Sequence, residues 1–467
     1  MHLLSLQCIY WFALTARSQV LTPLIIPLLV QQFVGEAQKG TYVGRIRLWS
    51  LMVAVLMQAV MGLLSDRSTS RWGRRRPFIV VGSIGEVVVF TMIGLSAGLS
   101  GMTGYWVLFA IYILSMIASN TAHAATQGLI PDLVPEDKRG LYSGIKALLE
   151  LPLPLVFASF VVGKMVGAGN LWGALISLMV VVLICMLLTL PVREEPLEHT
   201  PGPLDWEPII RMLLMTVVFT VVILGTGALV NLILGALQNA DRTPLKSIIV
   251  SLTGLLGMVT AVILGVWATM SVSMGAEVKD QKNFIWWVTT RLAFLVASTN
   301  LAGFMLYFLQ ERFQDLRGEQ AAGPASTIIM YVGIFIILTA LPSGWLSDKV
   351  GKKPLVIIAG LLAALGTAIV VLVPSLTAIY IGGCFIGAAM GLFYAANWAL
   401  GTDIVPQDQA GHYLGLSNIA GAGAGAIGAY IGGPIADKYG YVLLFSIYGM
   451  MFLLSMLTLQ GVKVEKG

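Results

Sequence analysis

The ionisable side chains best suited to chemistry lie inside long apolar segments, where a charge is costly and usually serves a function. They are Arg17, His123, Lys146 and Glu150. A carboxylate or an imidazole in such surroundings can take up and release a proton, and a nearby cation can sense the change. We therefore expect proton coupling, with Glu150 as the first carrier, His123 as the second, and Arg17 as the partner of ionised Glu150.

Each of these residues also has a purely structural interpretation. Lys146 and Glu150 are four positions apart on one helix, a spacing that favours a static ion pair. His123 can be a satisfied structural imidazole, and Arg17 can belong to a pair between helices. Glu86, in the third apolar segment, is interpreted as such a structural residue and is left out of the mechanism.

Uncharged polar side chains mark the face of the segment that carries His123. Asn120, His123 and Gln127 have spacings of three and four residues, so they share one face of a helix. We expect this face to line a water-filled cavity, because polar groups in lipid usually turn towards water or towards one another.

Aromatic side chains dominate the corresponding segment of the second half. Tyr394, Asn397 and Trp398 share a face, and aromatic rings beside an amide suit a sugar or another amphiphilic solute. A core aromatic stripe is the alternative. Asn300 and Arg291 lie in one segment of the same half and are further cavity candidates, although Arg291 near the segment's end can simply snorkel to the interface.

The composition requires a lipid environment for these segments. The chain is 57% hydrophobic and 11% charged, whereas soluble domains carry roughly 25% charged residues. We count about fourteen segments of membrane-spanning length. The predicted fold class is therefore an all-α polytopic membrane protein. The cysteines are far apart and predict neither a metal site nor disulfides.

Internal repetition divides the chain. The stretch around Asp132 is repeated around Asp403, and a basic stretch after Asp66 is repeated after Asp348, both at an offset of roughly 270–280 residues. Two six-helix halves would need a shorter offset, so we expect two added helices at 209–238 and 246–274. The predicted domains are a six-helix bundle at 1–192, a linker with the two added helices at 193–283, and a second six-helix bundle at 284–467.

The polar, proline-containing segment 192–206 is expected to be a plain cytoplasmic linker. The alternative is that its charged residues Arg193, Glu194 and Glu195 engage the basic loops.

The basic stretch reads Ser-Asp-Arg, Thr-Ser-Arg and Gly-Arg-Arg-Arg-Pro from Ser65 to Pro77, and a shortened copy runs from Gly344 to Pro354. This pattern resembles the loop between helices 2 and 3 of the major facilitator superfamily, and the first copy is most similar to the sucrose/proton symporter type. The resemblance implies two parallel repeats, alternating access, and an ion-pair latch on the cytoplasmic side; the alternative is a topology signal only. The residues expected in this gate are Gly62, Asp66, Arg67, Gly73, Arg74, Arg75, Asp132, Arg139, Gly344, Asp348, Gly351, Lys352 and Asp403. Because Ala410 stands where the first half has Arg139, a symmetric latch is in doubt.

The resulting functional prediction is a secondary transporter, and no enzyme, that moves a small organic solute with protons. A sugar or glycoside is favoured. A drug efflux antiporter and a non-transporting pigment or lipid delivery factor of the same fold are the alternatives. Expected partners are the solute, protons and the bilayer, without nucleic acid or cofactor, in a monomer. Basic residues collect in loops on one side, about fifteen against about nine that include Arg47, which places both termini in the cytoplasm. The expected location is the cell membrane of a prokaryote.

Overall fold

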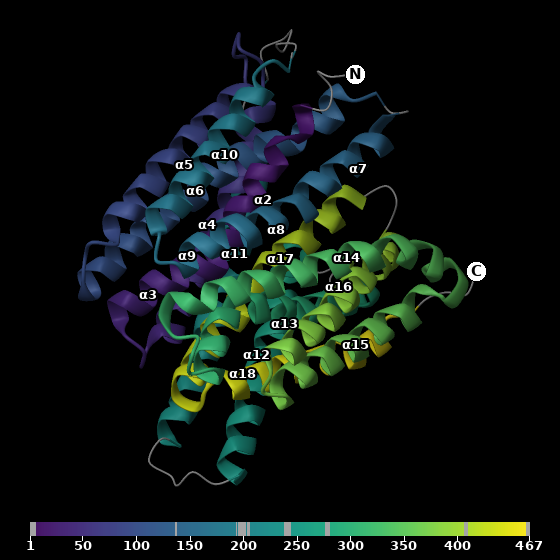
Figure 1. The fold of residues 1–467 in the computed structure, drawn as a ribbon. Helices are drawn as coiled ribbons and strands as arrows, with labels where there is room; N and C mark the ends of the chain where they lie inside the picture. Colours follow the sequence, from purple (N-terminus) through teal and green to yellow (C-terminus); the bar gives the residue numbers. More distant parts are fainter. Residues whose placement is uncertain are drawn as a thin grey trace. The chain divides into compact units, whose positions relative to one another are not determined.

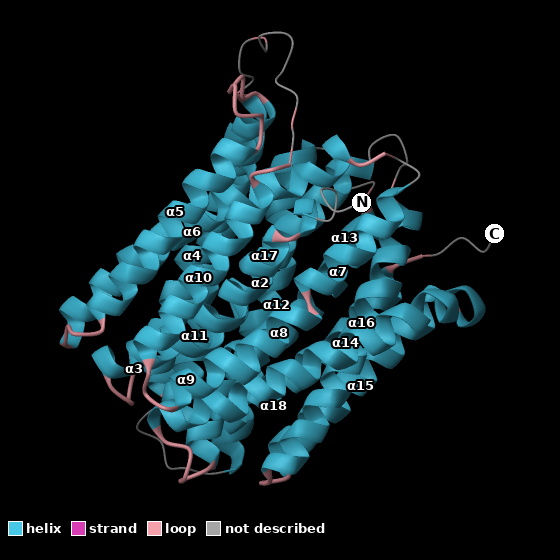
Figure 2. Cartoon of the chain, turned by 45° about the horizontal axis from the view of Figure 1, so that its top comes forward, coloured by secondary structure: helices cyan, strands magenta, loops and turns pink. Residues whose placement is uncertain are grey.

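The computed structural model shows a chain built from helices, and every regular element in its described part is a helix (Figures 1 and 2). Within that part, 13 helical segments are long and apolar enough to cross a membrane. A further long helix, α17 (Ala410–Tyr439), has several residues whose side chains are not described. The predicted all-α polytopic membrane fold is therefore confirmed. The described residues are 6–135, 138–192, 194, 202, 206–237, 244–275, 281–405 and 410–463.

The helices group into two compact units. The first unit comprises Met1–Gly35, Val53–Met212 and Arg317–Met330, and the second comprises Glu36–Met52, Leu213–Leu316 and Tyr331–Gly467. Helix α4 (Lys39–Asp66) and helix α14 (Ala322–Val350) each contribute one end to each unit. We describe the two units separately.

In the first unit, α5 packs on α6 and α10, and α10 also packs on α2. Both views show α5, α6 and α10 side by side (Figures 1 and 2). Its elements, besides the parts of α4, α11 and α14, are η1 (Leu6–Cys8), α2 (Tyr10–Val20), η2 (Leu21–Ile25), α3 (Ile26–Val34), α5 (Arg76–Ser96), α6 (Gly101–Leu133), α7 (Arg139–Glu150), α8 (Pro152–Phe157), η4 (Ala158–Val162), α9 (Gly163–Gly167), α10 (Leu171–Thr189) and η6 (Gly318–Ala321).

Two membrane segments of the first unit are interrupted, although the sequence predicts each as one helix. The first segment contains a π-helical turn at η2, which includes Pro23 and is followed by Pro27. The fifth segment breaks between α7 and α8 at Leu151, directly before Pro152, and contains a second π-helical turn at η4. Proline lacks a backbone donor and crowds the preceding turn, which explains why irregular turns occur near these prolines.

In the second unit, α13 packs on α17 and α18, and α15 packs on α16 and α18. The segments corresponding to the two interrupted ones are single helices here, α13 and α17. Its elements, besides the end of α4 and most of α14, are α11 (Glu207–Ala236), α12 (Pro244–Met274), α13 (Lys282–Arg312), α15 (Lys352–Leu372), α16 (Leu376–Ile404), α17, α18 (Tyr441–Thr458) and η8 (Leu459–Gly461).

The added helices α11 and α12 pack within the second unit. Helix α12 lies against α13, α17 and α18. The ring of Phe219 on α11 lies against Gly423 of α17, where an added Cβ would come within 2.3 Å of the ring. This contact shows a glycine-rich helix acting as a packing surface. The division into six, two and six helices stays a prediction.

Candidate functional site

The basic loop of the first unit is organised around one arginine. Gly73 has a φ of 106°, which favours glycine and turns the chain so that α5 can begin at Arg76. Arg75, only 6% exposed, forms ion pairs with Asp66 and Asp132; its Nη2 lies 3.0 Å from the Asp132 carboxylate. Its Nη1 donates to Ser65 Oγ at 2.7 Å. The sequence predicts that Asp66, Arg75 and Asp132 belong to one gate, and the structure shows that Arg75 connects the two aspartates.

The neighbouring residues of this loop have unequal roles. Arg74 also pairs with Asp132. The guanidinium of Arg67 donates to the backbone oxygen of Gly202 in the linker. Gly62 has only ordinary surroundings, since a Cβ there would lie 4.0 Å from Ala124. The side chain of Arg139 lies outside the described part of the chain, so its predicted place in the latch stays a prediction.

Glu194 of the linker is part of the same network. Its Oε2 accepts a hydrogen bond from the backbone N–H of Arg75 at 2.6 Å, at the start of α5. A carboxylate is favoured there by the unpaired N–H groups and the dipole of the helix. Burial nevertheless raises the pKa of Glu194 above its usual range. The linker thus engages the basic loop, which supports the alternative interpretation of segment 192–206 over a plain connector.

The shortened loop of the second unit repeats the turn with fewer charges. Gly351 has a φ of 92°, and α15 begins directly after it. Lys352 Nζ lies 2.5 Å from the Asp403 carboxylate and 3.2 Å from the backbone oxygen of Ala399. Within the described part of the chain, nothing lies within 4 Å of a Cβ added at Gly344. The side chain of Asp348 lies outside the described residues.

Arg17 forms a buried ion pair inside the first unit. Its Nε lies 3.0 Å from Glu86 Oε2, and its Nη2 donates to Ser115 Oγ at 2.5 Å. The Ser115 hydroxyl donates in turn to Glu86 Oε1 at 3.1 Å. In this structure, therefore, Glu86 holds the place that the sequence-based hypothesis gives to Glu150 as the partner of Arg17. Both side chains of the pair are at most 7% exposed.

The other predicted coupling residues gather around Trp11, which is not among the residues predicted from the sequence. Lys146 Nζ lies 3.8 Å from the Trp11 ring centroid and 3.5 Å from the Glu150 carboxylate. His123 packs edge-on against the same ring at 5.3 Å. Gln127 Nε2 lies 3.2 Å from His123 Nε2. We call these five residues the Trp11 cluster.

Asn120 does not join this cluster through its amide, although it shares the predicted helical face. It is buried and donates to the backbone oxygen of Met116 on its own helix. The Trp11 cluster thus includes four of the predicted site residues and omits Arg17 and Asn120. In the sequence, Trp11 is marked only as a tryptophan in the first apolar segment, and nothing there indicates that it lies at the centre of the cluster.

A second cation–aromatic cluster lies inside the second unit. The Arg291 guanidinium lies 5.2 Å from the Trp398 ring centroid and 5.8 Å from that of Trp287, and donates to Ser417 Oγ at 3.0 Å. Trp398 is 42% exposed and Tyr394 is 40% exposed. The structure thus gives Arg291 aromatic partners inside the unit, whereas snorkelling would take it to the interface. We call Arg291, Trp287, Tyr394, Trp398 and Ser417 the Arg291 cluster.

Two other cavity candidates of the second unit are buried. Asn397 is 2% exposed, and its backbone oxygen accepts a hydrogen bond from Trp287 Nε1 at 2.9 Å. Asn300 is fully buried and accepts from Arg47 Nη1 at 3.0 Å. Arg47 is itself 6% exposed within α4, so its predicted place in an outer loop is wrong. In the sequence, polar residues that bond to other helices inside the unit, such as Asn300, look the same as polar residues that line a cavity.

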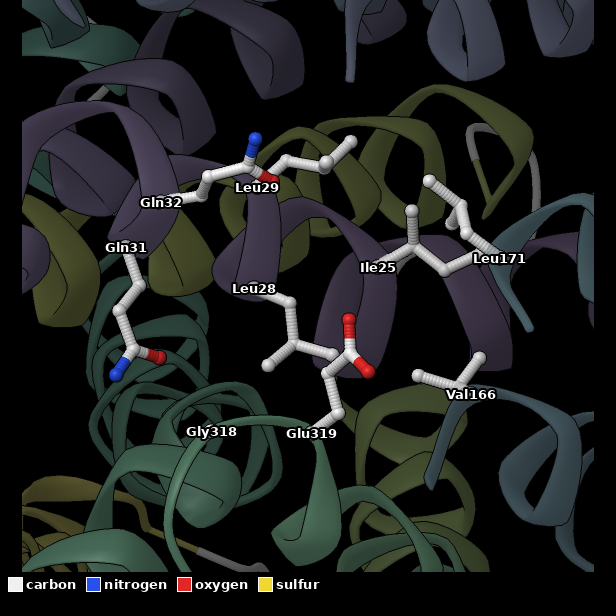
Figure 3. A pocket seen from close by; sticks show the side chains of 9 residues that line it. All are labelled: Ile25, Leu28, Leu29, Gln31, Gln32, Val166, Leu171, Gly318 and Glu319. Carbon is white, nitrogen blue, oxygen red and sulfur yellow. The ribbon is translucent and has the colours of Figure 1, made fainter. Parts of the chain in front are cut away.

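A small pocket lies in the first unit at the end opposite the basic loop, and it contains none of the predicted site residues. Its volume is about 300 Å³. Figure 3 shows the Glu319 carboxylate pointing in among Ile25, Leu28 and Val166. Gln32 donates to the backbone oxygen of Ala97, which fixes one side of the pocket. The same end holds η6, immediately before α14.

Comparison with known proteins identifies the architecture. Residues 6–311 and 288–465 match the model of the Major Facilitator Superfamily. A sucrose transport protein of Arabidopsis thaliana is 28% identical over 174 residues, which are 31% of this chain and 29% of that protein. A multi-drug resistance efflux pump of Streptococcus pneumoniae serotype 4 is 28% identical over 161 residues, which are 33% of this chain and 40% of the pump. The matched segments thus span less than half the length of either relative.

The fold comparison covers nearly the whole molecule. The crystal structure of a mutant of the nucleoside transporter NupG superposes with a TM-score of 0.64 at 13% identity, covering 99% of this chain and 100% of that one. At that identity the likeness concerns the fold alone. The family model matches nearly the whole chain, so the chain belongs to the Major Facilitator Superfamily, a family of multi-pass membrane transporters and not of enzymes.

Proposed function

We propose that this transporter couples the movement of a sugar or glycoside to the movement of protons. In this superfamily, two repeats related by an axis along the membrane normal expose a central site to one side and then to the other. The coupling residue must therefore lie near the middle of the membrane, be reached by water, and change its partner when it takes up a proton.

The observation that carries the proposal is the Trp11 cluster. Glu150 lies eleven residues after Arg139, where α7 begins, which places it about 16 Å along the helix axis. This is about half of the roughly 30 Å hydrocarbon core of a bilayer. The side chain of Glu150 is 39% exposed and that of Lys146 is 30% exposed, so the pair is not sealed inside the first unit.

The buried pair of Arg17 and Glu86 is the alternative coupling site, and its burial argues against it. The Glu86 side chain is 3% exposed and bonded to both Arg17 and Ser115. Removing one member of such a pair leaves an uncompensated buried charge. We assign Glu86 and Arg17 to a structural brace, and Glu150, Lys146 and His123 to the exchange of protons.

The Arg291 cluster supports a polyhydroxylated solute. Trp398 and Tyr394 offer exposed aromatic faces, and Arg291 adds donors beside them. Sugars are bound in proteins by such a combination of ring stacking and hydrogen bonds. The similarity to a sucrose transport protein, although it covers less than a third of each chain, supports the same class.

Efflux of amphiphilic drugs is the second candidate function. The segment similar to a multi-drug resistance efflux pump favours it, and exposed aromatic faces also suit apolar drug rings. The two functions differ in the direction of solute movement and in whether hydroxyl groups on the solute are needed.

The finer topology also belongs to the proposal. We place both termini in the cytoplasm, because positive residues collect in cytoplasmic loops. We also propose the cell membrane of a prokaryote as the location. The domains are the bundle at 1–192, the linker with the added helices at 193–283, and the bundle at 284–467. We propose that the protein works as a monomer.

The test measures the uptake of protons and of labelled solute by reconstituted vesicles, challenged with a panel of sugars, glycosides and amphiphilic amines. For the wild type we expect solute-dependent proton movement with a sugar or glycoside. Glu150→Gln should reduce it at least about tenfold, because removing a proton-transferring group typically costs 10²–10⁴-fold. The matched control is Glu207→Gln, since Glu207 forms an exposed pair with Arg211 at the same i,i+4 spacing.

Each outcome separates the parts of the proposal. Proton movement that survives Glu150→Gln keeps the carrier and removes Glu150 as the coupling residue. Movement driven only by amphiphilic amines favours drug efflux. Sugar uptake without proton movement in the wild type contradicts proton coupling while keeping the solute class.

A further inference from the structure

An apolar groove of about 640 Å³ runs along the outside of the first unit. It is formed by α4, α5 and α6, away from the Trp11 cluster and the small pocket of Figure 3. The residues that line the groove include Leu64, Pro77, Val81, Gly82, Val88 and Thr121.

Small residues form the floor of the groove. At Gly82 an added Cβ would lie 2.6 Å from the backbone oxygen of Ala118, so α5 and α6 approach closely there. Side chains on either side stand out from this floor, among them Val81 at 65% exposed and Val88 at 52% exposed. The groove therefore comes from the helix packing itself and does not depend on one side-chain rotamer.

The lining offers no free polar group. Thr121 has the only hydroxyl among the lining residues, and it donates to the backbone oxygen of Ile117 at 2.7 Å. A solute that needs hydrogen bonds gains nothing here, whereas a hydrocarbon chain gains van der Waals contact along the whole length.

The length of the groove matches one leaflet. From Pro77 to Met92 the axis of α5 rises about 22 Å, whereas half of a bilayer's hydrocarbon core is about 15 Å. A groove that begins at a loop in the headgroup region, which adds roughly 5–7 Å on each side of the core, therefore reaches about to the midplane. These dimensions fit one acyl chain of a phospholipid in the leaflet on the side of the loop.

The basic loop lies at the mouth of the groove, because it joins Leu64 on α4 to Pro77 on α5. Trp72 in this loop is 69% exposed, and exposed tryptophans are enriched at the depth of lipid headgroups. Arg71 is also exposed, and among the described residues no carboxylate pairs with it. Arg74 and Arg75, by contrast, are paired with carboxylates.

We propose that this groove binds one anionic phospholipid, with an acyl chain along Val81 and Val88 and the phosphate beside Arg71. Basic pockets next to membrane helices bind anionic headgroups on the cytoplasmic side, where anionic lipids give the membrane a negative surface potential. In the proposed orientation the basic loop faces that side. The site is separate from the solute site, and lipid binding does not require transport.

Native mass spectrometry of the delipidated full-length protein, titrated with phosphatidylglycerol or phosphatidylcholine of identical chains, tests the proposal. We expect one phosphatidylglycerol to bind at least about fivefold more tightly than phosphatidylcholine, the factor that one basic residue near a charged surface provides. Arg71→Gln should remove this preference, whereas Lys282→Gln, an exposed cation at the start of α13, should keep it.

A second variant tests the groove independently of charge. Val88→Phe fills it from an exposed position and should weaken binding of both lipids, whereas Val221→Phe, at a similarly exposed position of α11, should not. Equal binding of the two lipids by the wild type would overturn the headgroup assignment. Val88→Phe binding lipid as tightly as Val221→Phe would overturn the groove as the acyl-chain site.

Discussion

Arg75 in the first unit and Lys352 in the second hold corresponding places shortly after a glycine of positive φ, and each binds an aspartate at the end of a neighbouring helix. Arg75 joins two carboxylates and a serine hydroxyl. Among the described residues, Lys352 reaches one carboxylate and one backbone oxygen. The duplicated fold therefore keeps the turn, while the number of bonds across it differs between the two copies.

The chemistry of the two cations explains how this difference arises. A guanidinium presents several donors in a rigid plane and can bind more than one oxygen at once, whereas an ammonium acts as a compact point charge. Arg75 is also buried, while the Lys352 side chain is 27% exposed. We infer that the first loop is the stronger latch, and the following predictions test this asymmetry in order of expected effect.

The largest effect is expected for Arg75→Ala compared with Lys352→Ala. Loss of Arg75 leaves Asp66 without this cation and Asp132 with Arg74 alone, and it should lower the free energy of unfolding by about 2 kcal/mol, the scale of a hydrogen bond to a charged group. Loss of the more exposed Lys352 should cost about 1 kcal/mol or less. Denaturant titration of the purified protein measures both, and equal costs would show that the two latches are equivalent.

Exchanging the two cations should have an intermediate effect. Arg75→Lys should recover only part of the stability lost in Arg75→Ala, about 1 kcal/mol, because a lysine cannot reach Asp66, Asp132 and Ser65 together. Lys352→Arg should leave stability nearly unchanged, since Asp403 is the one carboxylate that pairs with Lys352 within the described part of the chain. The same denaturant titration measures both variants. If Arg75→Lys were as stable as the wild type, the geometry of the guanidinium could not explain the difference between the two loops.

The two turn glycines should differ by a smaller amount. Alanine at either position is strained by the positive φ, by about 1–2 kcal/mol. At Gly73 an added Cβ would also lie 2.8 Å from Glu194 Oε2, whereas at Gly351 the nearest atom is 3.6 Å away. Gly73→Ala should therefore be the more destabilising, and it should also free the linker to limited proteolysis. If Gly73→Ala and Gly351→Ala left the linker equally sensitive to protease, the contact between Gly73 and Glu194 would be contradicted.

The smallest predicted effect is a pH dependence of linker docking. Burial raises the pKa of Glu194 in the docked state. The Glu194 carboxyl therefore binds a proton more tightly when the linker is docked than when it is free. Docking is then most favourable below the usual glutamate range and weakens as pH rises through the higher pKa of the docked state. Protease cleavage within 192–206 should be slower at pH 5 than at pH 8, after correction with a peptide substrate.

Glu194→Gln is the matched control for that measurement. The amide resembles the protonated carboxyl and cannot titrate, so its cleavage rate should not change with pH. A pH dependence that persists in this variant would assign the effect to another group.

The sequence predicts the helical membrane fold and the repeated turns well, because hydropathy and glycine positions are local properties. Gly73 and Gly351 were both expected in the loops and both adopt positive φ. Partners across helices are not local. Periodicity shows which face Arg17 occupies, and it does not show that Glu86 and Ser115 on other helices face it.

The helix interruptions illustrate the same limit. A hydropathy window sees one long segment between residues 141 and 166, but Pro152 and the π-helical turn at η4 divide it. Trp11 joins His123 to Lys146 only once three helices are in place. Such a meeting point has no signature within a single segment.

The pairing of Arg17 with Glu86 has a consequence for how the protein enters the membrane. An arginine near the centre of a helix opposes insertion by about 2.5–3.5 kcal/mol on the scale measured for translocon-mediated insertion. The acid that neutralises Arg17 lies 69 residues later in the chain, so it leaves the ribosome well after the first helix does. The first helix is therefore expected to settle stably in the bilayer only when the third arrives, which makes the three leading helices a single unit of biogenesis.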